Sequence, residues 1–233
     1  MKALTRITQD FVSLFYPRLC LACGKNISPQ QSIVCVSCQY FLPKTNFHLE
    51  KENSFTEHFW GRIPLESAGA MYLFTKASRT QGLIHQLKYK GKKEIGYRLG
   101  LVYGEQLRAS EYFRGVDVIV PVPLHPRKLK ERGYNQSDGF AKGLSEAMEV
   151  PWIRNALKKV EMTSSQTKKS RIERMANVEN SFVLNNGDVL RGKHILIVDD
   201  VMTTGATLEA CAQKILVLPQ TKVSFATIAF ANH

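Results

Sequence analysis

The stretch 194-HILIVDDVMTTGAT-207 decides the fold, because it links an apolar segment to a helix start through two acids and a hydroxyl-rich turn. Its apolar, β-branched residues predict a buried strand over 194–198, and the following pattern predicts a helix over 207–217. Such a strand carries Asp199 and Asp200 at its carboxyl end. Ligands of parallel sheets bind at these ends, so we expect a binding site here.

The turn after the two acids is expected to bind a phosphate group. Helix-start N–H groups and the hydroxyls of Thr203, Thr204 and Thr207 suit a phosphate dianion, and Gly205 lets the backbone approach it without a Cβ atom. The two carboxylates suit vicinal hydroxyls of a sugar and can also contact Mg²⁺. A sugar with a phosphate at one end therefore fits the segment.

A purely structural interpretation of this segment is a strand, a turn and a helix capped by Thr203 or Thr204. It accounts for one threonine, but not for two acids that end a buried strand. The segment also lacks the GxxxxGK[ST] pattern of a P-loop and the GxGxxG pattern of a dinucleotide fold.

From about residue 61 the chain alternates expected strands and helices. The strands are expected at 67–74, 116–122, 153–160, 182–184 and 223–230, and the helices at 78–89, 94–109 and 135–148. This alternation predicts an α/β fold with a mostly parallel sheet covered on both faces. We expect a domain boundary within 41–60, which divides the chain into residues 1–60 and 61–233.

Four cysteines precede this boundary, as Cys20-x2-Cys23 and Cys35-x2-Cys38. Two such pairs can place four thiolates around one tetrahedral Zn²⁺ ion, and Gly24 permits the tight turn after the first pair. Four protein ligands leave no open position for a substrate, so the zinc is expected to be structural. Disulfides are the alternative, which a chain without a secretory signal disfavours.

Charge and composition narrow the class of protein. The 233 residues are 44% hydrophobic and 22% charged, which excludes a wholly disordered or coiled-coil chain. No apolar run reaches the roughly 20 residues that span a bilayer, so we expect a cytoplasmic protein. A predicted amphipathic helix over 3–15 leaves peripheral membrane association open. The net charge of +12 is concentrated in 76–93, 124–134 and 158–174, which favours a polyanionic ligand or a nucleic acid.

The segment 194–207 resembles the 5-phosphoribosyl-1-pyrophosphate (PRPP) motif of type I phosphoribosyltransferases. The resemblance implies the fold of that family. It also implies that Asp199 and Asp200 contact the ribose 2′- and 3′-hydroxyls, and that the 5′-phosphate is held by Thr203, Thr204, Gly205, Ala206 and Thr207. A pyrophosphate loop would then be 123–128, and a flexible active-site loop would be 163–174.

Other phrases are similar to the ComF family. They are LKYKG at 87–91, PVPLH at 121–125, ERGYNQ at 131–136 and RMAN at 174–177, together with the four cysteines, Gln166, Arg171 and Phe182. The family usually has Phe where this chain has Tyr134, a mild departure. Members pair an amino-terminal zinc ribbon with a phosphoribosyltransferase domain, and they are associated with DNA uptake during natural competence.

If the chain is an enzyme, the resemblance implies that a nucleophile displaces Mg²⁺-bound pyrophosphate from C1 of ribose. Beside the two aspartates, the expected catalytic residues are Lys168, Arg171 and Arg174. Further phosphate-binding residues are expected to be Lys88, Pro123, Arg127 and Lys128. The acceptor is not identified by any motif in the sequence.

Three functions remain open at this point. The first is a transferase that acts on a nucleobase, as in nucleobase salvage, or on another small acceptor. The second is a DNA-uptake protein that binds single-stranded DNA on its basic surface and zinc ribbon, with PRPP as ligand or regulator. The third is an adaptor between parts of the uptake machinery, such as its helicase and recombination-loading proteins. Aromatic side chains near lysines can stack on exposed bases, although core packing is expected for most of them; the candidates are Phe47, Phe59, Trp60, Tyr72, Phe74 and Tyr89.

Overall fold

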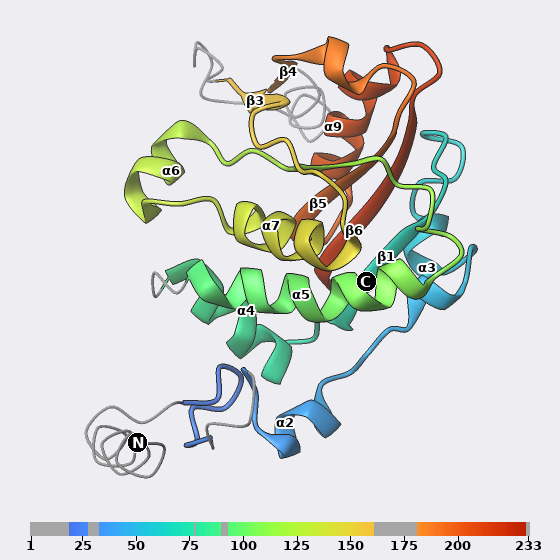
Figure 1. Cartoon of the computed structure of the whole chain (residues 1–233). Helices are drawn as coiled ribbons and strands as arrows, with labels where there is room; N and C mark the ends of the chain where they lie inside the picture. The colour runs from blue at the N-terminus through green and yellow to red at the C-terminus, as the bar shows by residue number, and fades with distance from the viewer. Residues whose placement is uncertain (1–18, 28–32, 77, 90–92, 161–180, 232–233) are drawn as a thin grey trace, which may run out of the picture.

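A parallel sheet forms the centre of the computed structural model, which describes residues 19–27, 33–76, 78–89, 93–160 and 181–231. Its strand order is β1-β6-β5-β2, and each of these neighbours pairs in parallel (Figure 1). The strands are β1 (Ala68–Leu73), β2 (Val118–Pro121), β5 (His194–Met202) and β6 (Lys222–Phe230). The predicted α/β fold with a mostly parallel sheet is confirmed.

The two inner strands are almost continuously apolar because helices cover both faces of the sheet. In β5 the residues from Ile195 to Val198 are buried, and in β6 those from Val223 to Phe230 are buried. Ile197 lies in register with Phe225 on one side and Val120 on the other. This core fixes the carboxyl end of β5, where the two aspartates lie.

Three helices cover one face of the sheet. They are α4 (Arg79–Tyr89), α5 (Lys93–Ala109) and α7 (Gln136–Met148). Their apolar side chains, including Leu83, Leu99, Phe140 and Leu144, form one core with Ile228 of β6. α5 and α7 lie against each other at four glycines, three on α5 (Gly96, Gly100 and Gly104) and Gly143 on α7. A Cβ atom on Gly143 would lie 2.0 Å from the carbonyl oxygen of Tyr97, so only glycine fits there.

The other face is covered by α3 (Ser54–Glu57), a 3₁₀ turn η2 (Gly187–Leu190) and α9 (Ala206–Leu216). Phe55 and Phe59 pack here on β6, with centroid separations of 5.3 Å between Phe55 and Phe230 and 4.9 Å between Phe59 and Phe225. Residues before the expected boundary at 60 therefore contribute to this core. The boundary itself stays a prediction.

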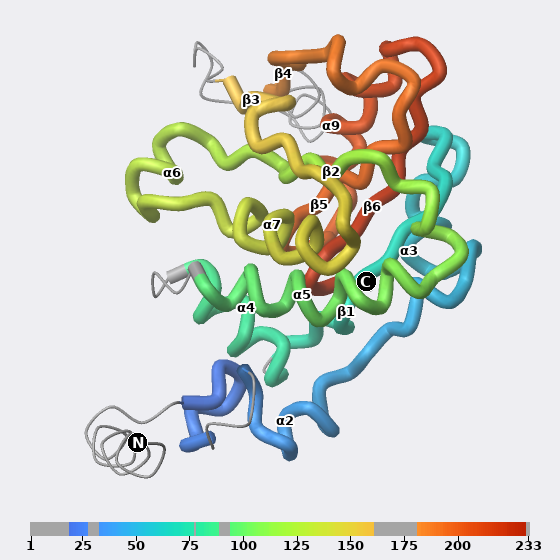
Figure 2. The backbone as a smooth tube through the Cα atoms, in the orientation of Figure 1, coloured from blue at the N-terminus to red at the C-terminus, as the bar shows by residue number. Residues whose placement is uncertain are grey.

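The cysteine segment lies beneath α4, on the side away from α9 (Figures 1 and 2). It holds an antiparallel bridge between Leu19 and Asn26 and the short helix α2 (Val36–Phe41). A 3₁₀ turn, η1 (Phe47–Leu49), follows and contacts β1. Cys20 and Cys38 are buried against the α4 side of the core.

Four elements differ from the sequence-based expectation. β5 continues to Met202, because Asp199, Val201 and Met202 still pair with β6. The expected strand over 153–160 shrinks to β3 (Leu157–Lys159), which pairs antiparallel with β4 (Phe182–Leu184) in a separate ribbon. β2 is shorter than 116–122. The expected loop 123–128 runs into a short helix, α6 (Pro126–Arg132).

Three residues account for where α6 begins and ends. Pro126 at the first turn presets a helical φ, and the His125 ring accepts a hydrogen bond from the backbone nitrogen of Arg127 at 3.2 Å. Gly133, at φ 74°, ends the helix.

Two expected elements lie outside the described residues: the amphipathic helix over 3–15 and the flexible loop over 163–174. Of the helices that the structure does describe, none is long and apolar enough to cross a membrane.

Candidate functional site

The two aspartates near the end of β5 differ in environment. Asp199 Oδ1 accepts hydrogen bonds from Ser137 Oγ at 2.9 Å and from the backbone nitrogen of Asp200 at 2.8 Å. Asp200 Oδ2 lies 3.2 Å from Lys88 Nζ at the end of α4. Burial raises the pKa of Asp199 to about 7, the charge of Asp200 acts in the same direction, and hydrogen bonds and Lys88 oppose it. Asp199 therefore changes its charge near neutral pH.

A pocket of about 200 Å³ opens over these carboxylates, and we call it the β5 pocket. Its walls come from the end of α4, residues 122–125, α6, the first turn of α7, β3, β5 and α9. Four cationic side chains line it with the two acids: Lys88, Lys128, Arg132 and Lys159. Burial lowers the pKa of Lys159, the charges of Cys211 and Asp199 raise it, and Lys128 lowers it further. The pocket therefore offers cations for phosphate oxygens beside acceptors for hydroxyl groups.

The threonine turn follows β5 directly and leads into α9. The N-cap residue of α9 is Gly205, and no side chain caps this end of the helix through a hydrogen bond. Neither Thr203 nor Thr204 therefore caps α9. Across the described ranges, the hydroxyls of Thr203, Thr204 and Thr207 have no hydrogen-bond partner. The purely structural interpretation of these threonines as caps is thus not supported.

Gly205 has a structural role that the sequence did not reveal. Its φ is +75°, and a Cβ atom there would lie 2.7 Å from Cζ of Phe59. Glycine is thus required by the backbone conformation and by the packing of an aromatic ring, and not only by room for a ligand.

The structure brings together part of the predicted site. Six predicted residues line the β5 pocket: Lys88, Pro123, Lys128, Asp199, Asp200 and Thr207. Thr203, Thr204, Gly205 and Ala206 form the adjoining turn and helix start without lining it. Arg127 is exposed on α6 and does not line the pocket. Lys168, Arg171 and Arg174 lie outside the described residues.

Sequence reasoning missed several residues that line the pocket. Arg132, Asn135 and Gln136 stand in the family phrase ERGYNQ, but no role was predicted for them. Lys159 lies near the end of the expected strand 153–160, within the basic stretch 158–174. Gln136 is buried, and within the described part of the chain its side-chain nitrogen has no hydrogen-bond partner. A buried unpaired donor beside a pocket is suited to a ligand oxygen.

The four predicted metal ligands form a second site. The sulfur atoms of Cys20, Cys23, Cys35 and Cys38 all lie within 4.8 Å of one another, and those of Cys23 and Cys35 are 3.8 Å apart. Four sulfurs at about 2.3 Å from a tetrahedral Zn²⁺ would be about 3.8 Å apart. All four are free thiols, and Gly24 makes the predicted tight turn at φ +76°. The cluster can therefore bind a zinc ion.

Backbone N–H groups stabilise the thiolate form of cysteines in this cluster, which is the form that binds a metal cation. Burial would raise the pKa of Cys20, but hydrogen bonds from the backbone of Cys35, Cys23 and Ala22 lower it to about 6. The backbone nitrogen of Cys35 lies 3.3 Å from Cys20 Sγ, and that of Cys38 lies 3.4 Å from Cys35 Sγ. N–H groups that point at sulfur stabilise thiolates, which are the form that binds metal.

The family model of the phosphoribosyl transferase domain matches residues 136–233. DNA utilization protein YhgH of Escherichia coli K12 is 37% identical over 204 residues, which cover 85% of this chain and 84% of that protein. Competence protein F of Haemophilus influenzae is 37% identical over 93 residues, covering 40% and 41% of the two chains. Competence protein ComFC of Bacillus subtilis is 36% identical over 99 residues, covering 42% and 38%. The chain belongs to the ComF family.

This membership agrees with the two sites of the chain. The ComF architecture of a cysteine cluster and a type I phosphoribosyltransferase domain is present, with the domain match beginning at the first residue of α7. Among solved structures, the match to glutamine PRPP amidotransferase of B. subtilis covers 58% of this ComF-family chain and 26% of that chain, at 20% identity and a TM-score of 0.41.

Proposed function

We propose that this ComF-type protein binds PRPP with Mg²⁺ in the β5 pocket and acts in DNA uptake. The observation that carries the proposal is the meeting of two carboxylates and four cationic side chains in one pocket at the carboxyl end of a parallel sheet. PRPP combines vicinal hydroxyls with phosphate and pyrophosphate groups, which these two kinds of side chain complement. The DNA-uptake role is supported by the names of the relatives, a DNA utilization protein and two competence proteins.

In this assignment, the ribose hydroxyls bind Asp199 and Asp200, and the 5′-phosphate binds the N–H groups and hydroxyls of 203–207. The pyrophosphate lies over 123–128 with Lys128 and Arg132. Lys88 is paired with Asp200 at 3.2 Å, so it must share that carboxylate with the sugar or turn to a phosphate oxygen. Mg²⁺ neutralises pyrophosphate charge when bound.

The chemistry that suits this arrangement is displacement at C1 of ribose. The bond from C1 to the pyrophosphate oxygen breaks, and a bond to the acceptor forms on the opposite face. Lys128, Arg132 and Lys159 stabilise the charge that grows on the leaving group, and preorganised donors of this kind often contribute about 10²–10³ in rate. Lys168, Arg171 and Arg174 are proposed to add to this charge from the basic loop. A nucleobase or another small molecule is the acceptor.

A thermal shift with PRPP and MgCl₂ tests the site. Ligand at 100 times its Kd adds about 2.7 kcal/mol, which for a chain of this size raises Tm by roughly 5–10 °C. The double variant D199N/D200N should abolish the shift. Asp188→Asn, an exposed acid on η2, is the matched control and should keep it. An unchanged shift in the double variant would refute the assignment.

We also propose that the cysteine cluster holds a structural Zn²⁺ ion and that the chain works in the cytoplasm. Four thiols without disulfides suit a reducing compartment. Partner proteins of the uptake machinery and membrane contact through 3–15 remain predictions.

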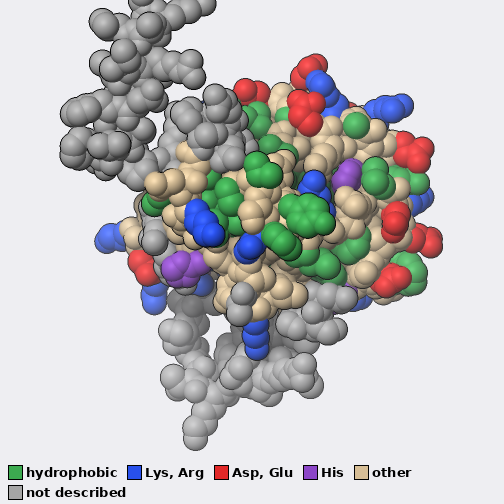
Figure 3. Space-filling view, turned by 90° about the horizontal axis from the view of Figure 1, so that it is seen from below, with side chains coloured by type: hydrophobic (Ala, Val, Ile, Leu, Met, Phe, Trp, Pro, Cys, Tyr) green, Lys and Arg blue, Asp and Glu red, His purple; other side chains and the backbone are tan. Residues whose placement is uncertain are grey.

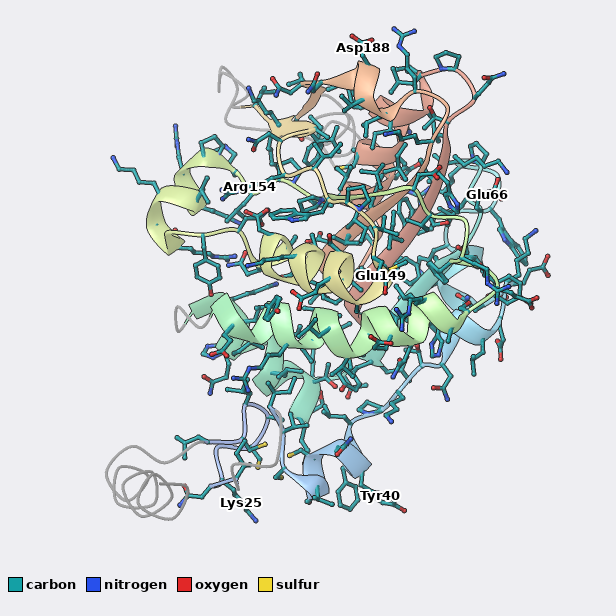
Figure 4. All side chains as sticks on the ribbon, viewed as in Figure 1. Lys25, Tyr40, Glu66, Glu149, Arg154 and Asp188 are labelled. Atoms are coloured by element: carbon teal, nitrogen blue, oxygen red, sulfur yellow. The ribbon has the colours of Figure 1, made fainter. Side chains whose placement is uncertain are left out.

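A second candidate function is binding of single-stranded DNA at α2, which one surface feature favours. Tyr40, Phe41 and Val36 are 82%, 61% and 66% exposed on this short helix. The guanidinium of Arg79 lies 4.5 Å from the Phe41 ring centroid, and neither 19–49 nor 67–93 contains an acidic residue. Tyr40 points away from the body (Figure 4). Exposed aromatic rings beside cations are typical of single-strand binding.

Figure 3 shows the molecule from below, which is the side on which α2 lies in Figure 1. Hydrophobic and basic side chains gather near its centre, and acidic side chains lie nearer its edges (Figure 3). Most aromatic residues considered from the sequence are unsuitable, because Tyr72 and Phe59 are buried and Phe47 and Phe74 are partly buried. Core packing was predicted for most of them, and for these it is confirmed.

Fluorescence anisotropy with a labelled oligo(dT) strand tests this surface. Tyr40→Ala with Phe41→Ala should weaken binding at least about tenfold, since each stacked base contributes roughly 1–3 kcal/mol. Affinity should also fall steeply with salt. Trp60→Ala removes another exposed aromatic ring, which follows α3 on the other face of the sheet, and should have no effect. Equal losses in both variants would remove α2 as the binding surface.

A further inference from the structure

A second and larger pocket lies beside the β5 pocket, and we call it the α6 pocket. It has a volume of about 400 Å³ and lies between α6, the first turn of α7 and β3, where Figure 4 shows Arg154. This volume is within the range of small-molecule sites. Pro123, Leu124, Asn135 and Lys159 line both pockets, so a shared wall separates them.

One wall of the α6 pocket is apolar, and within the described residues it is exposed at Pro126 and Leu129 and buried at Leu157. It is formed by Leu124, Pro126, Leu129 and Leu157. None of the residues of α6 is buried, and Leu129 is 37% exposed. A flat apolar group placed against Pro126 and Leu129, which are both exposed, would remove this surface from water, which is favourable in proportion to the area buried.

The opposite edge is polar and rigidly held. Asp138 Oδ2 accepts a hydrogen bond from Arg154 Nε at 2.7 Å, and its Oδ1 accepts one from Asn135 Nδ2 at 2.9 Å. Asn135 is in turn fixed by a hydrogen bond to the carbonyl oxygen of Val122. A carboxylate has about four acceptor positions, so two remain for N–H donors of a ligand.

The charge of the pocket favours an anion. Arg154, Lys158 and Lys159 line it, and Asp138 is the only acidic residue among its described lining residues. The side chain of Arg154 is 57% exposed, and among the described residues only its Nε is engaged. Its two terminal nitrogens are thus available to phosphate oxygens, which guanidinium groups bind well.

We propose that the α6 pocket binds a nucleoside monophosphate. The base packs on Pro126 and Leu129 with its N–H edge toward Asp138, and the phosphate binds Arg154 and Lys158. This ligand is distinct from the transfer acceptor and goes beyond the proposed function. The distinction rests on that function, because an acceptor must approach C1 opposite the pyrophosphate, whereas this pocket lies against the loop 123–128 proposed to hold it.

Titration calorimetry with GMP, AMP, CMP and UMP tests the proposal, with PRPP and MgCl₂ at saturation so that the β5 pocket is filled. At least one nucleotide should bind in the micromolar range, and PRPP should change its Kd less than about twofold. Leu129→Glu places a negative charge in the wall, and Arg154→Gln removes a phosphate donor. Each should weaken nucleotide binding at least about tenfold and leave the PRPP thermal shift intact.

Two control variants match these changes at positions far from the pocket. Val189→Glu on η2 alters a side chain with the same 37% exposure as Leu129. Arg191→Gln alters an arginine that is also 57% exposed and also paired through Nε, at 3.0 Å from Asp188. Both should bind nucleotide like the wild type.

Three results would overturn the proposal: no binding of any nucleotide at millimolar concentration, full binding by Leu129→Glu, or displacement of the nucleotide by PRPP. Failure of the proposed function looks different, because the PRPP shift itself would be absent.

Discussion

The ionisation of Asp199 should make PRPP binding depend on pH. Burial raises its pKa to about 7, from an ordinary value of 3.8, and a ribose hydroxyl or Mg²⁺ prefers the ionised carboxylate. With a pKa of about 7, roughly one tenth of Asp199 is ionised at pH 6 and roughly nine tenths at pH 8. We therefore expect the affinity for PRPP to rise about tenfold over this interval.

The raised pKa of Asp199 has the opposite effect on the stability of the free protein, which decreases as the pH rises. Because the folded state holds its proton to a higher pH than the unfolded state does, the folded state binds more protons between pH 4 and 7. The contribution of this group to the free energy of unfolding is present below pH 4 and is lost as the pH rises through 7. Asp199→Asn should remove this part of the pH dependence.

Calorimetric titration of PRPP and MgCl₂ at several pH values measures the effect on affinity, and denaturant titration of the free protein at the same pH values measures the effect on the free energy of unfolding. The phosphate groups of PRPP also titrate near pH 6, so the informative quantity is the difference between wild type and Asp199→Asn. The variant should bind more weakly at pH 8 and show a flatter profile. An equal pH dependence in the two proteins would refute the assignment of this titration to Asp199.

Three further outcomes are expected. Gly143→Ala should lower the free energy of unfolding by about 1–3 kcal/mol in denaturant titration, because its Cβ would overlap Tyr97 of α5; wild-type stability would contradict this contact. Gly205→Ala should lower Tm through strained φ and overlap with Phe59, and adding Phe59→Leu should recover part of the loss; additive losses would argue against the overlap. Cys20→Ser with Cys23→Ser should release the zinc measured by atomic emission and lower Tm, whereas zinc retained in full would exclude these ligands.

The sheet and the acidic strand end could be predicted because their signals are local. Buried parallel strands are continuous apolar runs, and the 194–207 segment joins strand, acids and turn within a few residues. The cysteine cluster was equally predictable, since two Cys-x2-Cys pairs constrain one another by spacing alone.

The remaining site residues depend on contacts between distant segments. Ser137 reaches Asp199 only because α7 crosses the end of β5, and Lys159 arrives from a separate ribbon whose length the apolar pattern overestimated. The sequence also did not reveal which aromatic side chains are exposed. Phe59 and Phe41 both lie among aromatic and polar residues, but Phe59 fills the space beside Gly205, whereas Phe41 lies open on α2.

The position of β6 has a consequence for how the chain is made. β6 separates β1 from β5, so the edge of β1 that faces β6, synthesised some 150 residues earlier, stays unpaired until residues 222–230 leave the ribosome, whereas its other edge pairs with residues 43–45. A nascent chain stalled before that point would expose unpaired strand edges, which promote aggregation. We therefore expect translation of this protein to favour a chaperone that shields β1 and β5 until the last strand inserts between them.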